Sequence, residues 1–312
     1  KISVLSPTRG RKDILCRGID SLIKSLSANA NVEFLFRFDE DDVSTSEDVM
    51  KYYETVETDS ASITNKFKWG ESTFKVSETM SKKHNVSMKF LIGHRHHYHY
   101  LNRYIDELMY VSDGEYVVNW TDDLELMTND NYEGWDSLIE EGAGQHYIFK
   151  FRNNSHTGEP LFPVVVPRKF FEINGRLCPN VLDDWWYEEL SKMLSPGVRV
   201  NLHWGVYHHC QFKETAWAHE MDSTCREGRV TWVKDRESKV KDGYEYYKIE
   251  DMLKIKEYMD DHPNFKKTTQ YHDTNISGRQ LAFSGPTGRW SAVERGESAD
   301  SAVCSLCKRP WN

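Results

Sequence analysis

Apolar residues in the first half of the chain alternate between short continuous runs and helical spacing. An apolar run at residues 2–7 leads into a polar loop, and the apolar positions of residues 14–26 then recur every three or four residues. The first pattern predicts a buried strand and the second an amphipathic helix. Further strands are predicted at residues 32–38 and 86–93, with another helix near 101–109.

The stretch at residues 114–126 carries the clearest chemical signal. An apolar run ends in two adjacent carboxylates, Asp122 and Asp123, and apolar residues resume at Leu124. This is typical of a buried strand that delivers acids to a cleft, where a divalent cation such as Mg²⁺ or Mn²⁺ would relieve their repulsion. A solvated turn in which one aspartate caps the next element is the alternative.

Strands that alternate with helices predict an α/β fold with a mostly parallel sheet flanked by helices. In such sheets ligands bind at the carboxyl ends of the strands. Polar clusters follow the predicted strands at Thr8-Arg9, at 39–42, at 94–97 and at Asp122-Asp123. We therefore expect them to share one rim of the sheet.

The organisation changes in the last third of the chain. A charged helix is expected within residues 235–262, and from residue 268 the composition is typical of an extended arm. The apolar positions of that helix predict a buried stripe of Ile249, Met252, Leu253, Ile255 and Met259. We predict a nucleotide-sugar-binding and catalytic domain at 1–215. The extension at 216–312 is expected to pack on it or on a partner subunit, which would make the protein a homodimer.

From residue 1 to about 210 the chain resembles the GT-A glycosyltransferases, especially inverting enzymes whose first strand ends in a sequence like Ser6-Pro7-Thr8-Arg9. The Leu101-Asn102 pair on a helix and the following Gly114-Glu115-Tyr116 strand fit the same pattern. The resemblance implies a GT-A (Rossmann-like) fold. It also implies transfer of a sugar from a nucleotide-sugar donor, with UDP favoured.

The resemblance also implies donor-binding residues. The nucleotide would contact Pro7, Thr8, Arg9 and either Asp39 or Asp41. Thr121-Asp122-Asp123 matches the DxD-type metal motif except at its first position. Asp123 is expected to bind the metal directly, with Asp122 facing the ribose or the donor sugar.

Three arginines are candidates to grip the donor phosphates, because a guanidinium binds phosphate oxygens in a bidentate manner. They are Arg9, Arg11 and Arg95, and each is equally well explained as a surface cation. The family places a general base at an acid just before a later helix. Asp183 and Asp184 match that place, and we favour Asp184; a helix cap is the compatible alternative. Trp185 and Trp186 are expected to form an acceptor platform or to lie in the core.

Two histidine features bear on metal choice. Some family members use a late histidine as a third ligand, which His203 in the predicted strand 198–204 would match, and imidazole favours Mn²⁺ over Mg²⁺. A hydrogen-bonded structural histidine is the alternative. The dense histidine run at residues 94–99 is expected to be a loop near the donor phosphates rather than a zinc site.

The six cysteines are scattered, which favours a reducing compartment over a disulfide framework. The Cys304-x-x-Cys307 pair suggests a structural zinc site completed by two of Cys210, Cys225, His208 and His209. Packing of the tail through Trp290 and Trp311 is the alternative. No apolar run reaches the ~20 residues that a membrane helix needs, and no signal peptide is visible. We expect a cytoplasmic protein of a bacterium or an infected host cell.

The acceptor is left open between a glycan and a hydroxymethylated pyrimidine in DNA, since the chain is similar to soluble glycosyltransferases of phages and other viruses. A net charge of −9 over 312 residues opposes broad binding to nucleic acid, although basic residues gather in the tail. A nucleotidyltransferase and a non-catalytic module that binds sugar nucleotides or glycans are the alternative functions.

Overall fold

The computed structural model describes residues 1–67, 70–96, 101–127, 134–153, 163–178, 183–194, 198–208, 244–264, 284–285 and 288–289. Its helices are α1 (Lys12–Lys24), α2 (Val43–Tyr52), α3 (Leu101–Val111), α4 (Trp135–Glu141), α5 (Arg168–Asn174), α6 (Asp183–Met193) and α9 (Tyr244–Asp261). Its strands are β1 (Ile2–Pro7), β2 (Val32–Asp39), β3 (Thr55–Phe67), β4 (Gly70–Ser81), β5 (Val86–Gly93), β6 (Tyr116–Asn119), β7 (Leu124–Met127), β8 (Ile148–Asn153), β9 (Val164–Pro167), β10 (Arg199–His208), β11 (Ser284–Gly285) and β12 (Gly288–Arg289).

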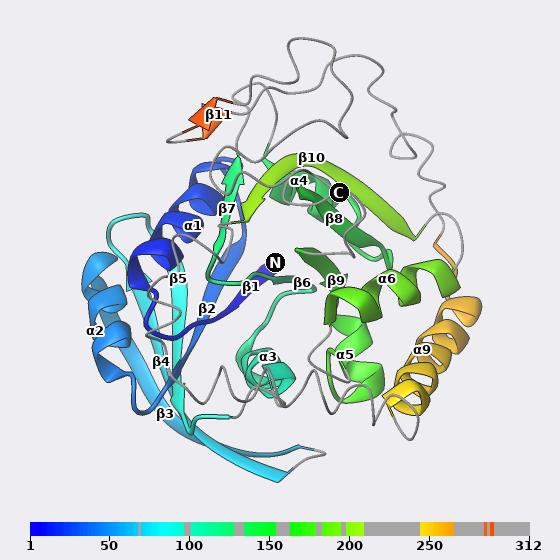
Figure 1. The fold of residues 1–312 in the computed structure, drawn as a ribbon, viewed down its shortest axis with the longest axis horizontal. Helices are drawn as coiled ribbons and strands as arrows, with labels where there is room; N and C mark the ends of the chain where they lie inside the picture. The colour runs from blue at the N-terminus through cyan, green and yellow to red at the C-terminus, as the bar shows by residue number, and fades with distance from the viewer. Residues whose placement is uncertain are drawn as a thin grey trace.

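One sheet of ten strands, in the order β3-β4-β5-β2-β1-β6-β9-β8-β10-β7, runs through the described part of the protein (Figure 1). The centre of this sheet, β5-β2-β1-β6, is parallel, and the connections between these strands carry the predicted helices. The predicted α/β fold with a parallel central sheet is therefore confirmed. Antiparallel pairs extend the sheet on both sides, with β4 beside β5 and β9 beside β6.

Helices cover both faces of the sheet. Leu15, Ile19 and Leu22 of α1 pack with Val4, Phe34 and other residues of one face of the central strands. On the opposite face, α3, α5, α6 and α9 pack over residues such as Leu5, Leu35 and Val117. Successive residues of the central strands thus point to opposite cores, as expected for strands buried on both sides. This arrangement explains why their sequences are apolar throughout.

The carboxyl ends of the parallel strands meet at one edge of the sheet. The backbone continues the pairing past the strands, because the Thr8 amide donates to the Arg37 carbonyl (3.0 Å) and the Trp120 amide to the Leu5 carbonyl (3.0 Å). The Glu40 amide likewise donates to the Gly93 carbonyl (2.8 Å). The loops after β1, β2, β5 and β6 therefore start from one ordered rim, as the sequence predicts.

The structure differs from the sequence predictions in two elements. The long antiparallel hairpin β3–β4 was not anticipated, and it forms an outer edge of the sheet. Helix α9 lies within the range expected for it but buries only part of the predicted stripe. Met252, Ile255 and Met259 are buried, whereas Ile249 and Leu253 are 46% and 52% exposed.

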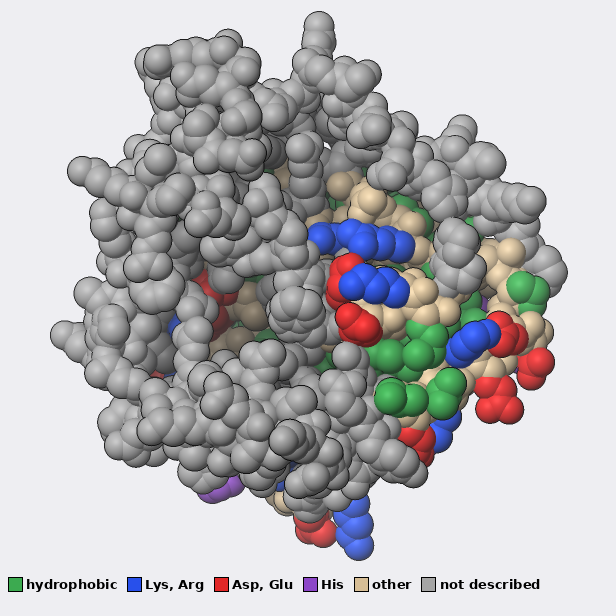
Figure 2. Space-filling view, turned by 45° about the vertical axis from the view of Figure 1, so that its right-hand side comes forward, with side chains coloured by type: hydrophobic (Ala, Val, Ile, Leu, Met, Phe, Trp, Pro, Cys, Tyr) green, Lys and Arg blue, Asp and Glu red, His purple; other side chains and the backbone are tan. Residues whose placement is uncertain are grey.

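Turning the α9 side forward reveals acidic and basic side chains interspersed on that surface (Figure 2). The i,i+4 ion pairs Lys254–Glu250 (2.6 Å) and Lys256–Asp260 (2.5 Å) of α9 fit this mixed surface. Among the described helices, none combines the length and apolarity that crossing a membrane requires.

Candidate functional site

Asp122 and Asp123 lie just beyond β6 and are almost fully buried. The Thr8 hydroxyl donates to Asp122 Oδ2 (2.8 Å), and Arg11 Nη1 donates to Asp122 Oδ1 (2.8 Å). Asp123 accepts a hydrogen bond from the Thr121 hydroxyl (2.7 Å), and its Oδ2 lies 3.7 Å from Arg11 Nη1. The predicted rim therefore brings Thr8, Arg11 and both aspartates into direct contact.

The electrostatics of this pair follow from its burial. Removal from water raises the pKa of Asp122, and the neighbouring Asp123 raises it further, while Arg11 and the Thr8 hydroxyl oppose the shift. A cation close to both carboxylates would favour their ionised forms. Arg11 is one such cation, and a bound metal ion would act in the same direction.

A close approach of α1 fixes the start of β7 directly after this pair. A Cβ added at Gly18 would lie 2.1 Å from the Leu124 carbonyl oxygen, so only glycine fits there. The Leu126 amide also donates to the Ser21 hydroxyl of α1 (2.8 Å). Helix α1 therefore holds the chain that follows the aspartates, and the Thr8–Arg11 loop that contacts them leads into the same helix.

Arg9 connects the loops after β1 and β2. Its guanidinium donates to Asp39 Oδ2 (3.0 Å) and to both carboxylate oxygens of Asp41, with 3.0 Å from Nη2 to Oδ2. Arg95 reaches Asp41 from the loop after β5 (3.8 Å). Hydrogen bonds from Arg9 hold the pKa of Asp41 below its ordinary value. Four of the predicted donor residues thus form one connected group.

Asp39 is oriented from its other side by Tyr104 of α3. The Tyr104 hydroxyl donates to Asp39 Oδ1 (2.9 Å) and also accepts from the His96 amide (2.8 Å). Asp39 is 3% exposed, and both of its carboxylate oxygens accept hydrogen bonds, Oδ1 from Tyr104 and Oδ2 from Arg9. The carboxylate is fixed before any ligand arrives.

A buried ionic network lies beneath this group. Arg37 is paired with Glu107 of α3 and donates to the His94 carbonyl oxygen (2.7 Å), and His96 Nε2 contacts the other Glu107 oxygen (2.7 Å). Burial alone would raise the pKa of Glu107, but hydrogen bonds from His96 and Arg37 outweigh it and lower that pKa. Arg37 and Glu107 were not predicted from the sequence, because nothing local marks Arg37 in β2 as buried.

The two predicted base residues stand at the start of a helix near the same rim. Asp183 and Asp184 are the first residues of α6, which runs back to β10, a strand parallel to β8. Their side chains and that of Trp185 lie outside the described residues. Trp186 is 1% exposed and packs against Tyr187, with ring centroids 5.1 Å apart. It therefore lies in the core and does not form an acceptor platform.

Strand β10 brings a different histidine close to the aspartates. The antiparallel register pairs His208 with Leu124, the residue after Asp123, whereas His203 lies five positions earlier in the strand. The side chains of both histidines lie outside the described residues. The sequence analysis considered His208 only for zinc, and the β7–β10 pairing was not visible in the sequence.

The donor set at the rim suits a hard cation. Asp122 and Asp123 offer carboxylate oxygens, and Mg²⁺ or Mn²⁺ is commonly held by one or two carboxylates together with substrate phosphates. Among the described residues, no group of three or more His, Cys, Asp or Glu side chains is arranged to bind a metal by itself. The residues therefore fit an ion shared with a phosphate-bearing ligand.

The predicted structural zinc residues Cys210, Cys225, Cys304 and Cys307 lie outside the described residues. Of the described cysteines, Cys16 and Cys178 are buried and carry thiol side chains. Burial raises the pKa of the Cys16 thiol to about 12, which makes it chemically inert at neutral pH.

No protein-family model matches the chain, and no curated protein is similar to it in sequence. Solved structures with a partial likeness include residues 1–349 of TarS from S. aureus. That match has 12% identity and a TM-score of 0.43, and it covers 68% of this chain and 61% of TarS 1–349. The same fragment in complex with UDP-GlcNAc gives 11% identity and a TM-score of 0.42, covering 66% of this chain and 58% of that one.

The mannosyltransferase PcManGT from Pyrobaculum calidifontis, in complex with GDP-Man and Mn²⁺, has 9% identity and a TM-score of 0.45. That match covers 75% of this chain and 64% of the other. The chain thus spans less than two thirds of the length of these structures. Likenesses at this level carry no functional argument, so the function of this chain rests on its own residues.

Proposed function

We propose that the protein is a metal-dependent GT-A-type glycosyltransferase that moves a sugar from a nucleotide-sugar, with UDP favoured, to an acceptor hydroxyl with inversion. The observation that supports this most is the single rim of the parallel sheet. Arg11 contacts Asp122 of the buried carboxylate pair there, and Arg9 contacts Asp39 in the neighbouring loop. Such a rim combines sites for a divalent ion and for phosphate.

The donor would bind across the loops after β1, β2 and β6. Asp39, held between Arg9 and Tyr104, offers a fixed acceptor for a nucleobase or ribose, beside Pro7 and Thr8. Arg9, Arg11 and Arg95 carry the positive charge that would face the phosphates. Asp41 would be the resting partner of Arg9 and Arg95, and Asp122 would face the ribose or the donor sugar.

We assign Asp123 as the metal-binding carboxylate, with His203 or His208 of β10 as a further ligand. When bound, Mn²⁺ or Mg²⁺ would act as a Lewis acid that offsets the negative charge of the departing diphosphate. Arg11 lies within 3.7 Å of Asp123 and 2.8 Å of Asp122, so it would add positive charge at the same place. The protein's own part is to hold these groups in a site largely shielded from water.

Asp184, or its neighbour Asp183, would act as the general base. A carboxylate at the start of α6 would take the proton of the acceptor hydroxyl as that oxygen attacks the anomeric carbon from the face opposite the diphosphate. The positive end of the helix favours the ionised form of a carboxylate there. Trp185 remains a candidate platform for the acceptor.

The acceptor is a glycan or a hydroxymethylated pyrimidine in DNA. For DNA, the base would have to leave the helical stack and be held by an aromatic or other planar group. We further propose that the chain divides near residue 215 and that the extension at 216–312 packs on the catalytic domain or on a partner subunit in a homodimer. The proposed location is the cytoplasm of a bacterium or an infected host cell.

A panel of sugar nucleotides with Mn²⁺ tests the function, with released nucleoside diphosphate as the readout. We expect UDP to dominate and activity to vanish in EDTA. Asp123→Asn and Asp184→Asn should each lower kcat by roughly 100-fold or more, because each removes a group that acts on the transition state. Asp184→Asn should keep its affinity for the donor, which separates a base from a binding residue.

Asp13→Asn is the matched control, since Asp13 lies in the first turn of α1 near the rim with a side chain 95% exposed. It should retain the activity of the parent protein. Undiminished turnover in EDTA, or in Asp123→Asn, would contradict the metal assignment. Release of a sugar 1-phosphate instead of a nucleoside diphosphate would favour a nucleotidyltransferase.

A further inference from the structure

A buried carboxylate of α3 holds the backbone just before the undescribed residues that lead into α6. Asp106 Oδ1 accepts a hydrogen bond from the Leu177 amide (2.9 Å), and Asp106 is 5% exposed. One turn earlier on α3, the Asn102 side chain donates to the Cys178 carbonyl oxygen (3.4 Å). Two consecutive residues of the α5–α6 connection are thus fixed to α3.

The same peptide is also tied to α6. The Tyr187 hydroxyl donates to the Leu177 carbonyl oxygen (3.5 Å), and Tyr187 follows Asp184 by three residues in the first turns of the helix. Leu177 therefore bridges two helices, with its amide bound to α3 and its carbonyl bound to α6. A shift of this peptide relative to α3 would move the beginning of α6.

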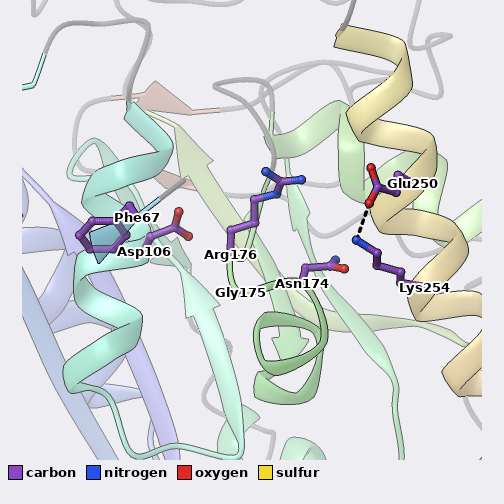
Figure 3. Close-up of a pocket in the computed structure, with 7 residues that line it drawn as sticks. All are labelled: Phe67, Asp106, Asn174, Gly175, Arg176, Glu250 and Lys254. Carbon is purple, nitrogen blue, oxygen red and sulfur yellow. Dashed lines mark hydrogen bonds and ion pairs between the residues drawn. The ribbon is translucent and has the colours of Figure 1, made fainter. Parts of the chain in front are cut away.

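A third helix restrains this connection from the other side. Arg176 forms a two-point ion pair with Asp251 of α9, at 2.6 and 2.8 Å, and both residues are buried. A cavity of about 150 Å³ lies between these elements, lined by Asp106, Arg176 and the Glu250–Lys254 pair among others (Figure 3). The charged groups near Asp106 are Arg103 and Glu107 on α3, Arg176, and the two α9 residues.

We propose that Asp106 is a positioning residue of the reaction: through the Leu177 peptide it sets where the acids at the start of α6 stand relative to the sheet rim. This rests on the proposed function, in which Asp184 or Asp183 is the base. Asp106 does not face the rim itself, because it lines the cavity on the α9 side of α3. Its effect would therefore reach the acceptor step and leave donor binding alone.

The hydrogen bond matters here more than the charge. Burial raises the pKa of Asp106 to about 8, so the group is mainly protonated at neutral pH. An asparagine can supply the same acceptor oxygen without charge, whereas a leucine of similar size leaves the Leu177 amide without an acceptor. These two substitutions separate the role of the hydrogen bond from that of shape.

Steady-state kinetics of Asp106→Asn and Asp106→Leu test the proposal, with Glu257→Gln on the exposed side of α9 as the control. Asp106→Leu should lower kcat by roughly 10- to 100-fold, the cost of a misplaced reacting group. The donor KM should stay within about twofold, because ground-state binding at the rim is untouched. Asp106→Asn should recover most of the lost kcat. Hydrogen exchange of residues 176–190 should rise only in Asp106→Leu.

A donor KM that rises as much as kcat falls, or an Asp106→Asn variant as impaired as Asp106→Leu, would overturn the proposal. So would unchanged kcat and unchanged exchange in Asp106→Leu. If Asp106→Leu does not fold, Asn102→Ala makes the same test through the Cys178 carbonyl. Should the parent protein bind and turn over no sugar nucleotide, the proposed function fails, while the exchange measurement still decides whether Asp106 holds the start of α6.

Discussion

At the scale of single residues, the buried carboxyl groups of this protein differ in which neighbouring groups offset the cost of their burial. Glu107 has Arg37 and His96 within hydrogen-bonding distance, and these contacts lower its pKa. Asp106 is its neighbour in the sequence but faces the other way. It accepts a hydrogen bond from the Leu177 amide, and burial outweighs this bond and raises its pKa. One carboxylate is therefore held ionised and the next one protonated.

Asp106 gives the protein a pH-dependent stability. A carboxylic acid with a folded pKa of about 8 keeps its proton where the unfolded chain has already lost it, from about pH 4 upward. The free energy of unfolding should therefore fall as pH rises from about 4 to about 8, by at most about 1.4 kcal/mol per pH unit from this group. Above that range the contribution is constant.

Asp106→Asn should remove this term, because an amide does not titrate. Urea unfolding of both proteins at pH 5 and pH 8 measures it: relative to the parent, the variant should gain stability at the higher pH. A difference between the two proteins that is the same at both pH values would contradict a raised pKa for Asp106. Glu257→Gln serves as the control for loss of an ordinary surface acid.

At the scale of elements, the contact between α1 and β7 determines how closely the site is packed. Gly18→Ala would place a methyl group against the Leu124 carbonyl, a backbone atom that cannot turn aside. We expect a loss of about 1–3 kcal/mol in the free energy of unfolding, as for other overpacked positions. We also expect lower activity, since Leu124 follows the aspartate pair. Chemical denaturation and the diphosphate-release assay measure the two effects.

Gly144→Ala is a useful comparison, because Gly144 has open space around its Cβ position but a positive φ of 77°. It should lose stability through backbone strain while keeping its activity. If Gly18→Ala is as stable as the parent protein, the close approach of α1 to β7 is wrong.

The elements that were predictable from the sequence are those with a strong apolar signal. The strands β1, β2, β5 and β6 are apolar because both faces are buried, and the polar residues after them mark the rim. The β3–β4 hairpin escaped detection because it forms a sheet edge rich in Ser, Thr, Lys and Glu. A usable signal was present in β4, where buried Ser72, Phe74 and Val76 alternate with exposed neighbours.

The contacts that orient the site were not predictable, because they join distant parts of the chain. Arg37 pairs with Glu107 across 70 residues, and Arg176 pairs with Asp251 across 75. Neither pair produces a recognisable pattern in the local sequence. A single charged residue in an apolar strand can equally well face solvent or pair with a distant residue of opposite charge. The rim itself was predictable, since it depends only on strand direction.

At the scale of the whole molecule, α9 is part of the same packed body as the sheet. Its residues Met252, Ile255 and Met259 share an apolar core with α3, α5 and α6. The Arg176–Asp251 pair adds a buried ionic contact to this interface. Breaking such a pair from one side leaves an uncompensated charge in the interior.

Arg176→Ala should therefore cost about 3–5 kcal/mol in the free energy of unfolding. The double substitution Arg176→Met with Asp251→Leu should be less costly than Arg176→Ala, because it removes both charges. Lys169→Ala, which breaks an exposed pair with Glu172, is the control and should change stability by less than about 1 kcal/mol. Thermal and urea unfolding of the four proteins measure these differences. A harmless Arg176→Ala would show that α9 contributes little to the main body.

The pairing of Arg9 with Asp41 has a consequence for how a charged ligand would be received. The Arg9 guanidinium is already paired with the Asp41 carboxylate. An incoming diphosphate would therefore displace that carboxylate from Arg9 instead of binding an unpaired guanidinium. The released Asp41 side chain, 49% exposed, would turn toward solvent at little cost. Affinity for the nucleotide would then be moderated by this competition, which suits a product that has to leave after each turnover.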